Sequence, residues 1–118
     1  SNKAADNRAN FELVNGVKFV GRAIPNVHPK ELKAFIDEIT PELGSGIVVL
    51  ASNNDDKASI VVGVTKDLTG RYSAIDLVRI ASQTVGGQGG GGRPDMAQAG
   101  GPNGEKIADA INAVKEAI

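Results

Sequence analysis

The chain has 118 residues, a formal net charge of −1, no cysteine and a single histidine. This length is enough for one hydrophobic core, which aliphatic side chains must build because aromatic residues make up only 3% of the chain. The near-neutral charge excludes an extended basic surface for nucleic acid, so any contact of that kind must be local. The cysteine and histidine counts exclude disulfides and argue against a zinc site. No apolar run is long enough to cross a membrane, and we expect a cytoplasmic protein.

The first half of the chain predicts a strand followed by an amphipathic helix. Residues 1–15 are polar, and we expect an N-terminal remnant or the end of a truncated helix there. Residues 17–24 alternate imperfectly between apolar and polar side chains, which indicates a strand. Pro29 suits the first position of a helix, and Pro41 with the glycines at 44–46 is expected to end it. The apolar residues at helical spacing on one face are Leu32, Phe35, Ile36, Ile39 and Leu43.

The second half predicts three more strands and two more helices. The continuous apolar run 47–50 indicates a buried strand, and residues 59–65 form a hairpin with it across a polar turn. Ser73 is expected to cap a helix that begins at Ala74 and runs into a glycine-rich segment. A short strand at 96–99 and a final helix then complete the chain.

The predicted order is therefore β-α-β-β-α-β-α, within one globular domain that spans residues 16–118. We predict an α/β fold in which a mixed sheet and its helices form two layers, with a glycine-rich loop after the second helix.

The segment from Gly86 to Gly101 is the most distinctive part of the sequence, with eight of the fifteen glycines (86, 87, 89, 90, 91, 92, 100 and 101). Successive glycines permit positive φ and expose backbone N–H groups without side chains, an arrangement that binds phosphate and other anions. Arg93 follows the run and carries a planar, permanently charged group suited to phosphate oxygens. Alternatively, the glycines only turn the helix back against the sheet, and Arg93 pairs with Asp95. The two interpretations are compatible.

We take this segment and one nearby lysine as the candidate nucleic-acid-binding residues. They are Gly86, Gly87, Gln88, Gly89, Gly90, Gly91, Gly92, Arg93 and Lys66. Lys66 is included because it follows a strand end, whereas its neighbour Asp67 is equally suited to a cap or a turn. Three other cations are expected to be solvated: Lys18, Arg22 and Arg71.

Catalytic and metal-binding roles find no support in the sequence. The string from Gly87 to Gly92 satisfies G-x-G-x-x-G, but it follows a helix, whereas dinucleotide binding requires that motif after a strand. His28 stands alone before Pro29 and is expected to start a helix. No Ser-His-Asp set has credible spacing, and we predict neither catalytic nor metal-binding residues.

The string Gly-Gly-Gln-Gly-Gly-Gly-Gly-Arg-Pro-Asp-Met-Ala-Gln-Ala-Gly-Gly closely resembles the C-terminal domain of bacterial alanyl-tRNA synthetases. That domain belongs to the DHH-associated family, which also occurs in RecJ-like nucleases. Thr65–Leu68, Ala74–Ala81 and the strand at 47–50 match as well, so the resemblance covers residues 16–118. Two features differ from the common form: Gln88 stands where lysine is frequent, and the glycine block 89–92 is one residue longer than in many members.

The resemblance implies a tRNA-binding domain of an alanine–tRNA ligase. Such a domain contacts the elbow of the tRNA, where the backbone counts more than base sequence, and supports aminoacylation and editing by the full enzyme. It implies alanine-specific tRNA and the other synthetase domains as partners, no membrane contact, and a monomer or weak dimer. ATP, magnesium and zinc are implied only for the full-length enzyme, and no cofactor for this fragment, which is expected to be non-catalytic.

Two rival functions remain open at this stage. The first is the substrate-binding domain of a DHH phosphoesterase, in which the same glycine loop holds a nucleic-acid backbone beside a metal site. The string from Arg93 to Ala99 favours the synthetase over this rival. The second is a protein-interaction domain with no role in nucleic-acid binding.

Overall fold

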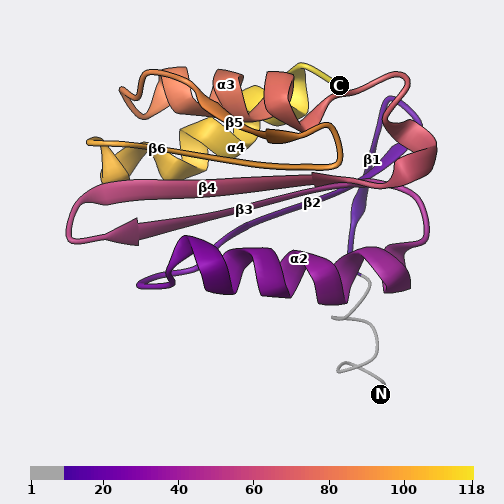
Figure 1. Ribbon diagram of the computed structural model, residues 1–118, viewed down its shortest axis with the longest axis horizontal. Helices are drawn as coiled ribbons and strands as arrows, with labels where there is room; N and C mark the ends of the chain where they lie inside the picture. The colour runs from indigo at the N-terminus through magenta and orange to yellow at the C-terminus, as the bar shows by residue number, and fades with distance from the viewer. Residues whose placement is uncertain (1–9) are drawn as a thin grey trace.

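The fold is a six-stranded mixed sheet with three α-helices, seen in the computed structural model of Figure 1, which describes residues 10–118. The strands are β1 (Glu12–Val14), β2 (Val17–Ala23), β3 (Ile47–Asn54), β4 (Lys57–Val64), β5 (Gly90–Arg93) and β6 (Met96–Gly101). The helices are α2 (Pro29–Leu43), α3 (Ala74–Thr84) and α4 (Ile107–Glu116), with short 3₁₀ turns η1 (Lys66–Leu68) and η2 (Gly104–Lys106). The strand order across the sheet is β1-β2-β3-β4-β6-β5.

One pair of neighbouring strands in the sheet is parallel, and the other pairs are antiparallel. β2 and β3 run parallel, which requires a crossover, and α2 supplies it. β3 and β4 form the predicted hairpin, closed by Asp55 and Asp56 with φ of 52° and 69°. Positive φ at both central residues is the requirement of a tight two-residue hairpin turn, and aspartate tolerates it.

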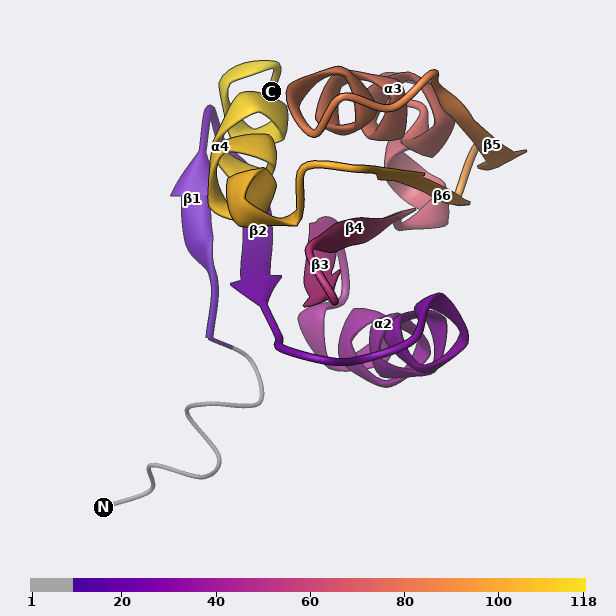
Figure 2. The same cartoon turned by 90° about the vertical axis from the view of Figure 1, so that its left-hand side faces the viewer.

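Helices cover both faces of the sheet. α2 lies on one face, and α3 and α4 lie side by side on the other (Figures 1 and 2). The buried apolar side chains accordingly form two clusters, the larger under α3 and α4 and the smaller under α2. The predicted α/β class is confirmed, and the seven predicted elements occur in the predicted order, together with two further strands, β1 and β5. The layers number three instead of two, because the crossover helix lies on the face opposite α3 and α4.

Two local expectations about the helices need adjustment. Pro29 begins α2, as predicted. Ser73 holds the N-cap position of α3, but its side chain makes no capping hydrogen bond. Pro41, however, lies inside α2, which ends only before Gly44, a residue with φ of 82°. A proline near the end of a helix removes a single hydrogen bond, and burial of Leu43 against the sheet holds the last turn beyond it.

The sheet also contains two strands that the sequence did not predict. Residues 12–14 form β1, inside the segment expected to lie outside the domain, while residues 1–9 lie outside the described residues. Residues 90–93 form the edge strand β5, so only the first part of the glycine segment, 86–89, is a loop. In β5 the missing side chains permit close pairing, because a β-carbon at Gly90 would lie 2.4 Å from the carbonyl oxygen of Gln98.

A candidate nucleic-acid interface

The structure divides the predicted binding residues between the two ends of β5. At its start, residues 87–90 line an open hollow of about 740 Å³ together with Arg79 and Gln83 of α3. At its end, Arg93 and Lys66 line a second hollow of about 260 Å³ beside α2. Lys66 therefore lies close to Arg93, which follows the glycine run. The loop at 86–89 lies apart from both residues, at the other end of β5.

The amides of the glycine turn are used within the fold. The N–H groups of Gly86 and Gly87 donate to the carbonyl oxygens of Gln83 and Ser82, at 3.2 and 2.8 Å. The N–H of Gly89 donates to the buried hydroxyl of Ser82 at 3.0 Å. A β-carbon at Gly87 would collide with the carbonyl oxygen of Gly100. These three amides cap the end of α3, so they do not form the free, anion-binding array that the sequence suggested.

Arg93 combines the two roles proposed for it. Its Nε atom lies 3.3 Å from a carboxylate oxygen of Asp95, so the internal pair is present. The side chain of Arg93 is nevertheless 73% exposed. Exposed pairs of this kind contribute only about 0–1 kcal/mol, and such a pair leaves most of the guanidinium open to a ligand.

Lys66 is an exposed first residue of η1, and its neighbour Asp67 has a structural role. The Asp67 carboxylate accepts hydrogen bonds from the hydroxyls of Ser45 and Thr65, the latter at 2.6 Å. These hydroxyls, Ser45 first, lower the pKa of Asp67 below its ordinary value. The aspartate thus joins the end of β4 to the loop after α2, which fixes the backbone that carries Lys66.

Two of the cations expected to be solvated have specific contacts. Lys18 donates from Nζ to the carbonyl oxygen of Leu43 at 3.1 Å and lies 4.9 Å from the centre of the Phe11 ring. It therefore caps the negative end of α2. The Arg71 guanidinium lies 5.3 Å from the ring centre of Tyr72.

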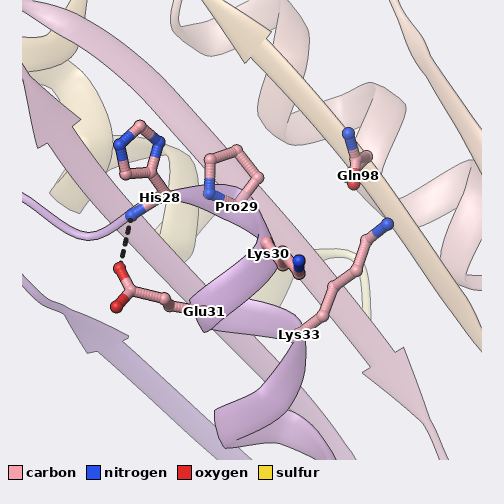
Figure 3. Close-up of a pocket in the computed structure, with 6 residues that line it drawn as sticks. All are labelled: His28, Pro29, Lys30, Glu31, Lys33 and Gln98. Carbon is pink, nitrogen blue, oxygen red and sulfur yellow. Dashed lines mark hydrogen bonds between the residues drawn. The ribbon is translucent and has the colours of Figure 1, made fainter.

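A third hollow, of about 670 Å³, lies at the start of α2 (Figure 3). His28 occupies the N-cap position, as expected for a residue that starts a helix, and its N–H donates to the Glu31 carboxylate at 3.3 Å. Lys30, Lys33 and Gln98 of β6 complete the lining. Sequence analysis missed these three residues, although two lysines three apart on a helix share one face.

Neither metal chemistry nor a membrane span is indicated by the described residues. Across residues 10–118, no three His, Asp or Glu side chains gather in a way that could hold a metal ion. In the same range, none of the helices has the length and apolarity needed to cross a bilayer.

Comparison with known proteins decides the family. The DHHA1 domain model matches residues 16–118, the range over which the resemblance was predicted. The crystal structure of the C-Ala domain from Aquifex aeolicus alanyl-tRNA synthetase superposes with a TM-score of 0.84 and 31% sequence identity, covering 91% of this chain and 96% of that one. The chain belongs to the DHHA1 domain family, among the C-Ala domains of alanyl-tRNA synthetases.

Two alanine–tRNA ligases contain segments that are similar in sequence to this DHHA1 domain. The alanine–tRNA ligase of Mesorhizobium japonicum is 59% identical over 108 residues, which are 91% of this chain and 12% of that protein. The alanine–tRNA ligase of Chelativorans sp. is 56% identical over 117 residues, 98% of this chain and 13% of that protein. The chain thus spans about an eighth of the length of these relatives.

A similar fold also occurs in a more distant solved structure. A solved DHH-domain protein described as a member of the s1p family of ribosomal proteins superposes with a TM-score of 0.57 at 16% identity, over 98% of this chain and 29% of that one. At this identity the similarity shows the fold alone. The DHH phosphoesterase alternative is therefore not favoured over the synthetase.

Proposed function

We propose that this DHHA1 domain binds tRNA on behalf of an alanine–tRNA ligase. Its similarity to C-Ala domains at 31% identity over nearly the whole of the solved chain supports the assignment. The observation that carries the binding role is the exposed pair of cations, Arg93 and Lys66, which line one hollow at the end of β5. Both are exposed, and within residues 10–118 the weak contact of Arg93 with Asp95 is the one side-chain contact that holds either of them.

The expected mode of contact is recognition of backbone and shape at the elbow of the tRNA. With 13 basic and 14 acidic residues the chain has no excess of positive charge, so it suits a small footprint of phosphates and 2′-hydroxyls. Such a domain would hold one tRNA for both the aminoacylating and the editing domains of the ligase, with alanine-specific tRNA and those domains as partners.

We assign the chemistry to the rest of the ligase. ATP, magnesium and zinc would bind in those other domains, and this fragment would act without a cofactor, as a monomer or weak dimer. The purified chain is expected to show no aminoacylation, deacylation or nuclease activity. Turnover of ATP with alanine, or metal-dependent cleavage of RNA, would contradict this assignment.

The binding role is tested by filter binding of a tRNA transcript at low salt. The wild-type chain is expected to bind, and the double variant Lys66→Ala with Arg93→Ala is expected to bind at least about a hundredfold more weakly, because each charge-assisted contact contributes about 1.5–3 kcal/mol. No binding by the wild type, or equal binding by both proteins, would overturn the proposal and favour a protein-interaction domain. Unchanged melting temperatures would show that the double variant remains folded.

A further inference from the structure

The edge of the sheet formed by β6 and β5 is only partly covered by α2. α2 packs chiefly on β3 and β4, and β5 projects beyond it (Figure 2). Met96 and Gln98 of β6 point to this face, since Met96 packs with the cluster under α2 and the two residues alternate with buried Ala97. Their partners in β5 are Arg93 and Gly91.

The two hollows beside α2 lie next to each other along this edge, and we treat them as one groove. Lys30, Lys33 and Gln98 line its first part, and Asp37, Met96 and Arg93 belong to its second part. The parts adjoin because Lys33 and Asp37 are one helical turn apart, and Met96 and Gln98 share a face of β6. From Lys30 to the end lined by Thr40, the α2 wall is about 15 Å long.

The two lysines of this wall are available to a ligand. Both are exposed, and within residues 10–118 neither makes an ion pair or a side-chain hydrogen bond. In Figure 3 the Lys33 side chain extends from α2 toward Gln98 across the hollow. A β-carbon at Gly91, on the far side, would meet no atom within 4 Å, so that side of the groove is open as well.

We infer that this groove binds the sugar-phosphate backbone of the tRNA along its whole length, with Lys30 and Lys33 as additional phosphate contacts. The inference rests on the proposed function and extends the footprint from Arg93 and Lys66 along α2. The amide of Gln98, in the floor, can donate to a 2′-hydroxyl or phosphate oxygen and accept from a 2′-hydroxyl. Gly91 leaves room for the backbone to lie against the sheet.

The charge of the groove fits a weak, backbone-directed site. Four cations, Lys30, Lys33, Lys66 and Arg93, line it against three carboxylates. Two of the carboxylates have partners, Asp95 with Arg93 and Glu31 with the N–H of His28. Asp37 is exposed in the middle of the wall and opposes the binding of a phosphate.

Two groove variants and one matched control test the inference by titration of a tRNA transcript over a range of salt concentrations. The double variant Lys30→Ala with Lys33→Ala is expected to bind on the order of tenfold more weakly, and the slope of log affinity against log salt should become shallower by about 1.5. Asp37→Asn is expected to bind about two- to fivefold more tightly. The control, Lys106→Ala with Lys115→Ala, removes the same charge from η2 and α4, on the opposite face of the sheet, together with the exposed pair of Lys115 and Glu12. It should match the wild type in tRNA binding.

The outcomes distinguish a failure of the groove proposal from a failure of the proposed tRNA-binding function. If the wild type binds and the Lys30–Lys33 variant behaves like the control, the groove is overturned and the binding role stands. If the wild type does not bind, both are overturned. Tighter binding by Asp37→Asn cannot arise from damage to the fold, so the absence of any gain in that variant would also count against the groove.

Discussion

Gly91 lies opposite Gln98 in the pairing of β5 with β6, and its missing side chain leaves open space on the groove side of the sheet. Its neighbour Gly90 lies opposite Ala99, and a β-carbon there would lie 2.4 Å from the carbonyl oxygen of Gln98 and 2.6 Å from the Ala99 side chain. Two consecutive glycines therefore serve different purposes. Gly90 permits β5 to pair closely with β6, whereas Gly91 keeps a surface clear.

The first prediction separates these two glycines by substitution with valine. Gly90→Val is expected to lower the free energy of unfolding by about 1–3 kcal/mol, because the backbone of β6 must move to admit the side chain. Gly91→Val should leave stability within about 0.5 kcal/mol of the wild type, since its site is open, yet weaken tRNA binding by obstructing the groove. Urea unfolding and filter binding on both variants measure the two effects. Equal losses of stability would contradict the assignment.

Arg93 is expected to contribute to binding more than to folding. Arg93→Ala should weaken tRNA binding by about 1–3 kcal/mol, one to two decades in affinity, while the melting temperature stays nearly constant, because an exposed ion pair contributes little. Arg93→Lys should recover only part of the affinity, since an ammonium group cannot reproduce the bidentate fork of the guanidinium. An Arg93→Ala variant with wild-type affinity would show that Arg93 pairs with Asp95 and does not contact the tRNA.

A substitution of Gln88, at the other end of β5, is expected to strengthen tRNA binding. Gln88 lines the hollow that also contains Arg79, and it lies in an exposed turn. Gln88→Lys should tighten tRNA binding slightly and steepen the slope of log affinity against log salt by about 0.7–0.9. Gln88→Glu is the matched control and should shift affinity in the opposite direction. If neither variant changes affinity, this hollow lies outside the tRNA footprint.

Asp67 predicts a specific dependence of stability on pH. Its pKa is lowered in the folded state, chiefly by the Ser45 hydroxyl and then by that of Thr65, so ionisation of the carboxyl stabilises the fold. This contribution is present above the unfolded-state pKa, taken as 3.8, and is lost as the pH falls through the folded-state value. Asp67→Asn should therefore be less stable than the wild type near neutral pH, and the difference should shrink below pH 3.8.

Chemical unfolding of both proteins at neutral pH and at a pH near 3 measures this difference. A gap that stays constant, or grows, as the pH falls would mean that the hydroxyl contacts do not favour the ionised carboxyl. Ser45→Ala is a useful companion, because it removes the first-ranked contact and should reduce the same pH-dependent component.

The sequence predicts the central elements of this fold because their signals are local. The apolar run in β3, the helical spacing in α2 and the Asp55–Asp56 turn are each readable within a few residues. β1 and β5 were missed for a different reason. Each is an edge strand of three or four residues with few side chains to bury, and only pairing with a distant partner makes it a strand.

The site shows the same division between local and tertiary signals. Arg93 could be selected because it follows the glycine run and Lys66 because it follows a strand end, and the structure brings them to one hollow. The sequence left two roles open for the glycine turn and could not decide between them, because hydrogen bonds to Ser82 and Gln83 depend on how α3 ends. Lys30 and Lys33 resemble ordinary solvated lysines until the groove between α2 and β6 is known.

The most direct test of the account is the salt dependence of tRNA binding by the wild-type chain. Four cations line the groove, and each neutralised phosphate contributes a slope of about −0.7 to −0.9, so log affinity should fall with log salt at a slope of roughly −3. Filter binding of one tRNA transcript at five or so salt concentrations measures this slope. A slope near −8 would reveal a much larger basic footprint than these residues provide, and a slope near zero would contradict backbone recognition altogether.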